Sequence, residues 1–103
     1  MALSIVPAGS NNTVEYNTAS GAGCATCNIG LEASGSNSFF EYNTIDGFYT
    51  NVAIACAVGS VFSNNVLSNA GMWGTFDKDG GYCTGYTIGT NTINGVATTG
   101  YTL

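Results

Sequence analysis

The sequence contains no histidine and no arginine, and its single basic residue is Lys78. Without histidine, neither a Ser-His nor a Cys-His catalytic pair can form. Nucleic-acid binding is excluded as well, because lysine and arginine bind the phosphates, and the chain has one such residue against six acidic ones, for a net charge of −5. The same shortage of positive charge disfavours an anionic membrane surface.

Long apolar runs are absent too. None approaches the roughly 18 residues that a membrane-spanning helix needs, so we expect no membrane insertion. The opening 1–7 lacks the charged start and the length of a signal peptide, so we expect that a signal was removed or that the chain continues upstream. Only 7% of the residues are charged, whereas 45% are hydrophobic and 12% aromatic. Disordered chains have the opposite composition, so the 103 residues should fold as one small domain.

The most informative feature of the sequence is an internal repeat. Four segments align at an anchor asparagine, and the anchors are spaced 26, 22 and 26 residues apart. They are Asn17, Asn43, Asn65 and Asn91. An apolar residue stands three places before each anchor and another stands two places after it, and both columns should point into the core. The columns are Val14, Phe40, Phe62 and Ile88, and Ala19, Ile45, Leu67 and Ile93.

A second apolar patch follows each anchor after a glycine-rich turn, at 29–31, 52–54, 73–76 and 100–103. These patches alternate with the period of two that is typical of strands, and no segment has helical periodicity. Three turn dipeptides punctuate the chain: Asp46-Gly47, Asp79-Gly80 and Asn94-Gly95. The pattern therefore predicts that each repeat forms two or three short strands joined by turns.

The pattern Asn-Thr-Ile-x-Gly, followed by a small-residue turn and an alternating patch, resembles the right-handed β-helix repeat of the pectate-lyase-like superfamily. The resemblance runs from Ser10 to Leu103. It implies an all-β, right-handed parallel β-helix (β-solenoid) of about four open-ended coils. Residues 1–103 would form one domain, with 1–9 as a cap or lead-in. Equivalent residues would then stack about 4.8 Å apart, so the anchor asparagines should form a hydrogen-bonded ladder that holds the turns.

Four cysteines, an even number in a short chain, indicate two disulfides and an extracellular or cell-surface location. Cys24 and Cys27 have zinc-knuckle spacing, but Cys56 and Cys83 are not a second close pair and no histidine can complete a site. A thioredoxin-like role is disfavoured because no βαβ pattern surrounds the Cys-x-x-Cys. Cys56 and Cys83 lie about one coil apart, so we expect them to pair, with Cys24–Cys27 as a local loop closure.

Enzymes of the resembled superfamily use acidic Ca²⁺ ligands and a basic residue, and here only Lys78 could be that base. Asp77 and Asp79 flank Lys78 in the way that two aspartates begin a calcium-binding loop, but the later ligands of such a loop are missing. We therefore expect no cofactor, with calcium as the alternative. Glycosidases use paired carboxylates, and Glu15 and Glu41 hold the same place in successive coils. They are the catalytic candidates; the other interpretation is that both point into water. We expect a protein that is not an enzyme.

Three functions fit these features. The first is a non-catalytic extracellular structural module, because unpaired strand edges at the ends of a β-helix template association. It would stack end to end with like subunits or form part of a longer β-helix, and 101–103 reads as its last strand. The alternative is a carbohydrate-binding or polysaccharide-degrading protein, with Tyr16, Tyr42 and Trp73 as stacking faces for a polysaccharide.

The second alternative is ice binding by a flat, threonine-bearing face. Two clusters of threonine, at 90–92 and 98–99, favour this function. The external column of Thr18, Thr44 and Thr92, however, is interrupted by Val66. Ice binding therefore ranks behind carbohydrate binding.

Overall fold

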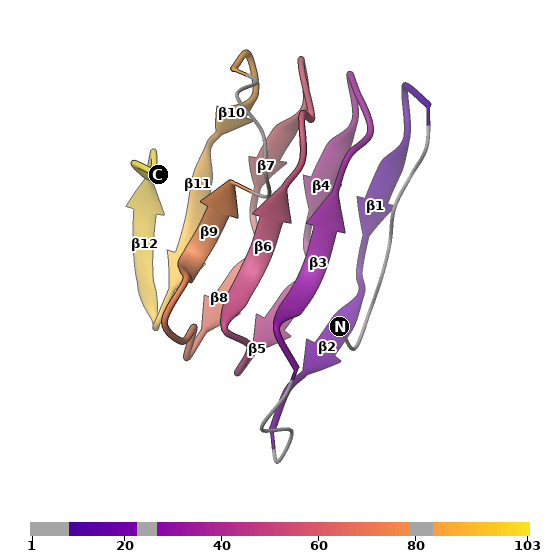
Figure 1. The fold of residues 1–103 in the computed structure, drawn as a ribbon. Coiled ribbons are helices and arrows are strands. Elements are labelled where there is room, and N and C mark those ends of the chain that lie inside the picture. The colour runs from indigo at the N-terminus through magenta and orange to yellow at the C-terminus, as the bar shows by residue number, and fades with distance from the viewer. Residues whose placement is uncertain (1–8, 23–26, 79–83) are drawn as a thin grey trace.

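The computed structural model describes residues 9–22, 27–78 and 84–103, and all regular secondary structure in these ranges is β (Figure 1). Twelve strands follow one another along the chain. The first nine are β1 (Thr13–Glu15), β2 (Thr18–Ser20), β3 (Ile29–Ala33), β4 (Phe39–Glu41), β5 (Thr44–Asp46), β6 (Thr50–Ile54), β7 (Val61–Ser63), β8 (Val66–Ser68) and β9 (Gly74–Lys78). The last three are β10 (Thr87–Ile88), β11 (Thr90–Ile93) and β12 (Val96–Thr99).

The strands form three sheets, each of which takes one strand from every coil. Sheet 1 has the order β1-β4-β7-β10, sheet 2 the order β12-β11-β8-β5-β2, and sheet 3 the order β3-β6-β9. Every pair of neighbouring strands is parallel except β11 and β12. The molecule is therefore a β-solenoid, and the fold class predicted from the repeat is confirmed.

The core lies between the three sheets and is built from the predicted columns. Register pairs Val14 with Phe40 and Phe40 with Phe62, and the two phenylalanine rings stack with centroids 4.8 Å apart. In sheet 2, Ile45 pairs with Leu67, and both are buried. Alternation explains this arrangement, because the middle residue of each three-residue strand points inward while its neighbours point to solvent.

Sheet 3 closes the core from the third side. Its inward columns are Leu31, Val52 and Phe76, and then Ala33, Ile54 and Lys78. All of these except Lys78 are buried. The strands of sheet 3 are five residues long, against two to four in the other sheets, so sheet 3 contributes two inward columns where sheet 1 contributes one.

The coil count differs from the prediction of four: about three coils are complete. A fourth begins with β10 and β11, but the chain then reverses at Asn94 and Gly95, both of which have positive φ (49° and 81°). Two consecutive residues with positive φ make the tight turn of a hairpin, and Asn-Gly is its preferred sequence. The chain returns as β12, antiparallel to β11. The interpretation of 100–103 as a last strand patch is wrong, because this segment forms no strand.

The anchor asparagines form a continuous ladder along the corner between sheets 1 and 2. Asn17 Nδ2 donates to Asn43 Oδ1 at 3.0 Å, Asn43 Nδ2 to Asn65 Oδ1 at 3.1 Å, and Asn65 Nδ2 to Asn91 Oδ1 at 2.9 Å. The same oxygens also accept the backbone N–H of the preceding asparagine. The ladder thus satisfies the corner's backbone donors, for which no strand partner exists.

Candidate functional site

Two places on the surface gather the residue types that bind ligands. One is the tyrosine stack, made by Tyr16 and Tyr42 beside Glu15 and Glu41. The other is the end pocket, at the C-terminal end of the solenoid. The sequence named the residues of the first, the tyrosines as stacking faces for a polysaccharide and the glutamates as a carboxylate pair in successive coils. The second depends on how the chain turns back after β11.

The tyrosine stack sits on the corner that the asparagine ladder holds. Tyr16 and Tyr42 each precede an anchor and have positive φ (57° and 56°), an uncommon conformation for a tyrosine. Their rings are nearly parallel, at 8°, with centroids 5.3 Å apart. Tyr16 is 72% exposed and Tyr42 46%. Each ring covers one face of the other, so a ligand approaching from the side meets ring edges, and the outer face of Tyr16 is the ring face that stays exposed.

The two catalytic candidates lie next to this stack. Glu15 and Glu41 are direct partners in the register of β1 and β4, so the structure brings the predicted pair together. Glu15 is exposed and Glu41 is half-buried, and both occupy outward positions of sheet 1. The residue that follows in their column is Ser63. The geometry matches the interpretation in which both side chains point into water.

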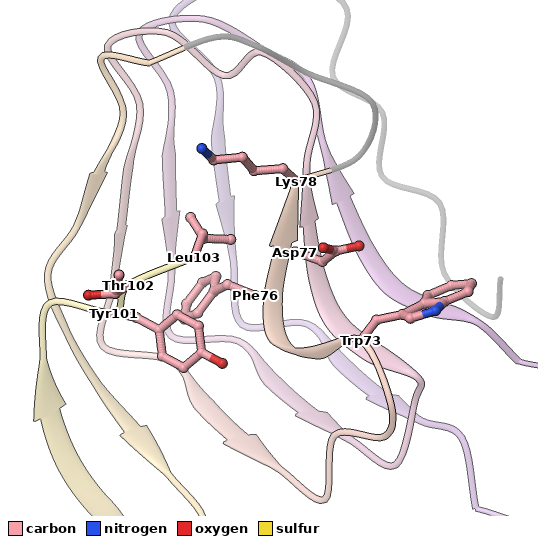
Figure 2. A pocket seen from close by; sticks show the side chains of 7 residues that line it. All are labelled: Trp73, Phe76, Asp77, Lys78, Tyr101, Thr102 and Leu103. Atoms are coloured by element: carbon pink, nitrogen blue, oxygen red, sulfur yellow. The ribbon is translucent and has the colours of Figure 1, made fainter.

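The end pocket is a hollow of about 250 Å³ at the exposed edge of sheet 3. Its lining comes from β9, from the residue before it and from the segment after β12: Trp73, Phe76, Asp77, Lys78, Tyr101, Thr102 and Leu103. Figure 2 shows that Phe76, Lys78, Tyr101 and Leu103 lie on one side of β9, while Trp73 and Asp77 point to the other side. The strand edge therefore runs through the middle of the site.

The pocket combines aromatic surface with unused polar groups. The Tyr101 ring packs against the buried Phe76 ring with centroids 5.3 Å apart, and Trp73, 44% exposed, meets Tyr49 edge-on at 5.5 Å. Within the described part of the chain, the Lys78 ammonium has no carboxylate partner and the Tyr101 hydroxyl has no hydrogen bond. No described strand pairs with the outer edge of β9. Its outward N–H and C=O groups are thus available to a ligand.

Of the three predicted aromatic stacking residues, Trp73 reaches this pocket, whereas Tyr16 and Tyr42 belong to the tyrosine stack. Asp77 and Lys78, which the sequence offered as a calcium ligand and a base, line the pocket too. Sequence reasoning missed Tyr101 because 101–103 was predicted to be a strand. The signal that could have found it is Asn94-Gly95, which was recognised as a turn but not as a hairpin that returns the chain over Phe76.

The structure describes one of the two candidate calcium ligands. Across 9–22, 27–78 and 84–103, no group of three or more Asp, Glu, His or Cys residues is placed to hold a metal ion. Asp77 is half-buried on the outer side of β9, and Asp79 lies outside the described residues. No cofactor, with calcium as the alternative, stays the prediction.

The cysteine pairing also stays a prediction. Cys27 and Cys56 are disulfide-bonded, and neither has a free thiol. Their predicted partners, Cys24 and Cys83, lie outside the described residues. Cys56 is exposed and has a positive φ of 54°.

The threonine column expected for ice binding is present on the outer face of sheet 2. Register places Thr18 beside Thr44, Thr44 beside Val66, and Val66 beside Thr92. Val66 is exposed, so an isopropyl group interrupts the row of hydroxyls at its third position. Among the residues that the structure describes, Thr90 on β11 and Thr99 on β12 are the one threonine pair whose hydroxyls share a hydrogen bond, at 2.7 Å.

The described residues contain no helix that is long and apolar enough to cross a membrane. Comparison with known protein families, with curated proteins and with solved structures gave no match. The functional assignment must therefore come from the geometry of the two sites.

Proposed function

We propose that this chain is a non-catalytic β-solenoid module that binds a saccharide across the edge of β9, in the end pocket. The observation that carries the proposal is the combination found there. Aromatic rings lie on both sides of a strand edge that no described strand pairs with, and beside them are an ammonium and a hydroxyl without a partner among the described residues. Sugar rings present apolar C–H faces and polar hydroxyl rims. A site of this kind supports both contacts at once.

Each side of β9 offers a different contact. On one side, Tyr101 supplies a ring face and a hydroxyl, and Lys78 supplies an ammonium that donates hydrogen bonds but accepts none. On the other side, Trp73 supplies an exposed indole and Asp77 a carboxylate, which accepts bonds from hydroxyl groups. The volume of about 250 Å³ is below the ~300–1,000 Å³ of drug-sized sites, so one sugar unit suits it better than a long segment.

The proposal of a non-enzyme is supported by the placement of the glutamates. Paired glycosidase carboxylates flank the scissile bond of a bound sugar, whereas Glu15 and Glu41 lie side by side on an outward sheet face. They are also on sheet 1, and the end pocket is at the edge of sheet 3. A saccharide held by Tyr101 and Trp73 would not meet them.

Binding to a panel of neutral and acidic oligosaccharides, measured by isothermal titration calorimetry, tests the proposal. We expect Trp73→Ala to raise Kd about tenfold, since the loss of ~1.4 kcal/mol of ring contact is a factor of ten. Tyr101→Phe, which removes only the hydroxyl, should weaken binding less. Tyr16→Ala is the matched control, because it deletes an exposed aromatic residue outside the pocket. Binding that is lost in Tyr16→Ala and kept in Trp73→Ala would move the site to the tyrosine stack.

A second candidate function, structural association, is favoured by the first rung of the ladder. Oδ1 of Asn43, Asn65 and Asn91 accepts two donors each, whereas Asn17 Oδ1 accepts none from the described residues. The outer face of the Tyr16 ring is open as well. We propose that any association, with a like subunit or with a further coil, uses the first coil.

Sedimentation velocity separates the two candidates. If the chain associates through its first coil, Tyr16→Ser should reduce the association and leave saccharide binding unchanged. A chain that stays monomeric at every concentration would remove the structural candidate and leave the saccharide candidate standing.

We further propose an extracellular location and membership of the pectate-lyase-like superfamily. The location is supported by Cys56, an exposed half of a disulfide, since such bonds persist in oxidising compartments. The superfamily is supported by three parallel sheets around one core and by an asparagine ladder at the corner.

A further inference from the structure

The C-terminal end of the solenoid differs from every junction between coils inside it. Between coils, each strand finds a parallel partner one repeat later. At the last coil, each sheet ends in a different way, and β12 is the outermost element (Figure 1). Whether a further coil can add to this end depends on those three sheet ends.

Sheet 2 ends in a reversal. β12 covers the free edge of β11 over four residue pairs and runs antiparallel to it. A further coil approaching sheet 2 would meet β12, whose direction is opposite to that of every other strand in the sheet. A strand that continued the repeat beside β12 would have to pair antiparallel to it, so the parallel ladder of sheet 2 stops at β11.

The asparagine ladder also ends at this point. Asn43 and Asn65 each give one amide hydrogen to a strand carbonyl of the preceding coil and one to the next asparagine. Asn91 gives its hydrogens to the carbonyls of Phe62, at 3.2 Å, and Gly89, at 3.5 Å. The hydrogen that Asn43 and Asn65 give to the next asparagine thus makes only a long bond within its own coil at Asn91.

The last strand of sheet 3, β9, ends in the charged residue Lys78. Lys78 occupies the inward column in which Ala33 and Ile54 are 0% and 2% exposed, yet Lys78 itself is exposed. The sequence places its only basic residue at the one inward position of sheet 3 that the solenoid does not cover. A further coil stacked on β9 would bury this ammonium without a partner, which is strongly unfavourable. Inward-pointing charges are a known protection of strand edges.

Sheet 1 ends in β10, which has two residues. So short an edge is a poor template for another strand. At the edge of sheet 3, the Tyr101 ring covers the Phe76 ring of the last complete coil. The apolar surface that a further coil would use is therefore partly occupied by the chain itself.

We propose that these features act together as a cap that closes the C-terminal end of the solenoid to the addition of a parallel coil, with Lys78 and β12 as its two components. The solenoid is consequently polar: like subunits cannot stack head to tail, and any axial association is confined to the end formed by the first coil. This goes beyond saccharide binding and does not depend on it.

Removing the cap tests the proposal. In one variant, 96–103 is deleted and Lys78 is replaced by Ile, the residue found one coil earlier in its column. The matched control carries the same deletion with Lys78→Glu, which keeps a charge at that position. We expect the weight-average mass of the Ile variant to at least double with rising concentration in sedimentation equilibrium, and that of the Glu variant to change little. A folded Ile variant that stays monomeric, or a Glu variant that associates equally, would overturn the proposal.

A second measurement uses the intact chain, so the result does not depend on the folding of truncated variants. Amide hydrogen exchange in β9 and β12 is followed as the concentration is raised. A closed end predicts that exchange in both strands is independent of concentration, even if amides of β1 become protected. Protection of β9 or β12 that grows with concentration would show that this end binds another copy, and the proposal would be wrong.

Discussion

The asparagine ladder gives the sharpest stability prediction, at Asn65→Ala. The Asn65 side chain takes part in four hydrogen bonds: it accepts from the backbone N–H and Nδ2 of Asn43, and it donates to the Phe40 carbonyl and to Asn91 Oδ1. All four are buried. At about 1 kcal/mol net for each bond, their loss lowers the free energy of unfolding by about 4 kcal/mol.

A further cost comes from the group that is left behind. The backbone N–H of Asn43 would be buried without an acceptor, at about 1–3 kcal/mol. The total, about 5–7 kcal/mol, is comparable with the ~5–15 kcal/mol of a whole domain. For a chain of this size, 1 kcal/mol shifts Tm by about 4–8 °C, so we expect a fall of at least ~20 °C, or no folding at all.

The control is Asn17→Ala at the first rung. Asn17 Nδ2 donates to Asn43 Oδ1 and to the Glu15 carbonyl, but its own Oδ1 accepts nothing from the described residues. Its loss should cost only about 1–2 kcal/mol, because two bonds disappear and no buried backbone donor is stranded. Urea denaturation followed by circular dichroism measures both variants. If Asn65→Ala costs no more than Asn17→Ala, the ladder does not hold the corner.

Three other changes give independent checks. Cys56→Ser should lower the free energy of unfolding by roughly 3–4 kcal/mol in the chain-entropy model, and Cys24→Ser should lower it less, because the predicted Cys56 bridge closes the longer loop. Thermal unfolding compares the two variants, and peptide mass spectrometry without reduction checks the pairing. Gly30→Ala should prevent folding or cost several kcal/mol, since its methyl would lie 2.5 Å from a side-chain carbon of β5; soluble yield and circular dichroism report this. Replacing both Glu15 and Glu41 by Gln should leave polysaccharide cleavage unchanged in a reducing-end assay; cleavage that disappears in the double variant would identify an enzyme.

The tyrosine stack could be anticipated from the sequence because it depends on local order. Tyr16 and Tyr42 stand at the same place in successive repeats, and a parallel solenoid stacks such places on each other. The same logic predicted the columns of Val14, Phe40 and Phe62 and the pairing of Glu15 with Glu41. A repeat with a fixed period carries this information in the spacing itself.

The end pocket could not be anticipated in that way, because it arises where the repeat stops. Residues 96–103 look like another coil by composition, since alternating threonine and apolar residues suit parallel and antiparallel strands alike. Only the left-handed conformations of Asn94 and Gly95 decide that the chain turns back on β11. That reversal brings Tyr101 over Phe76 and leaves a hollow at the edge of β9.

The sequence by itself thus determined the β-solenoid, its asparagine ladder and its inward columns, since these follow from residue types at a repeated spacing. The tertiary structure alone decided the number of complete coils, the direction of β12 and the exposure of Lys78 in a column whose earlier members are buried. The physical reason is that each interior coil is fixed by identical neighbours above and below it. The last coil has a neighbour on one side only, so its conformation depends on contacts that no repeat specifies.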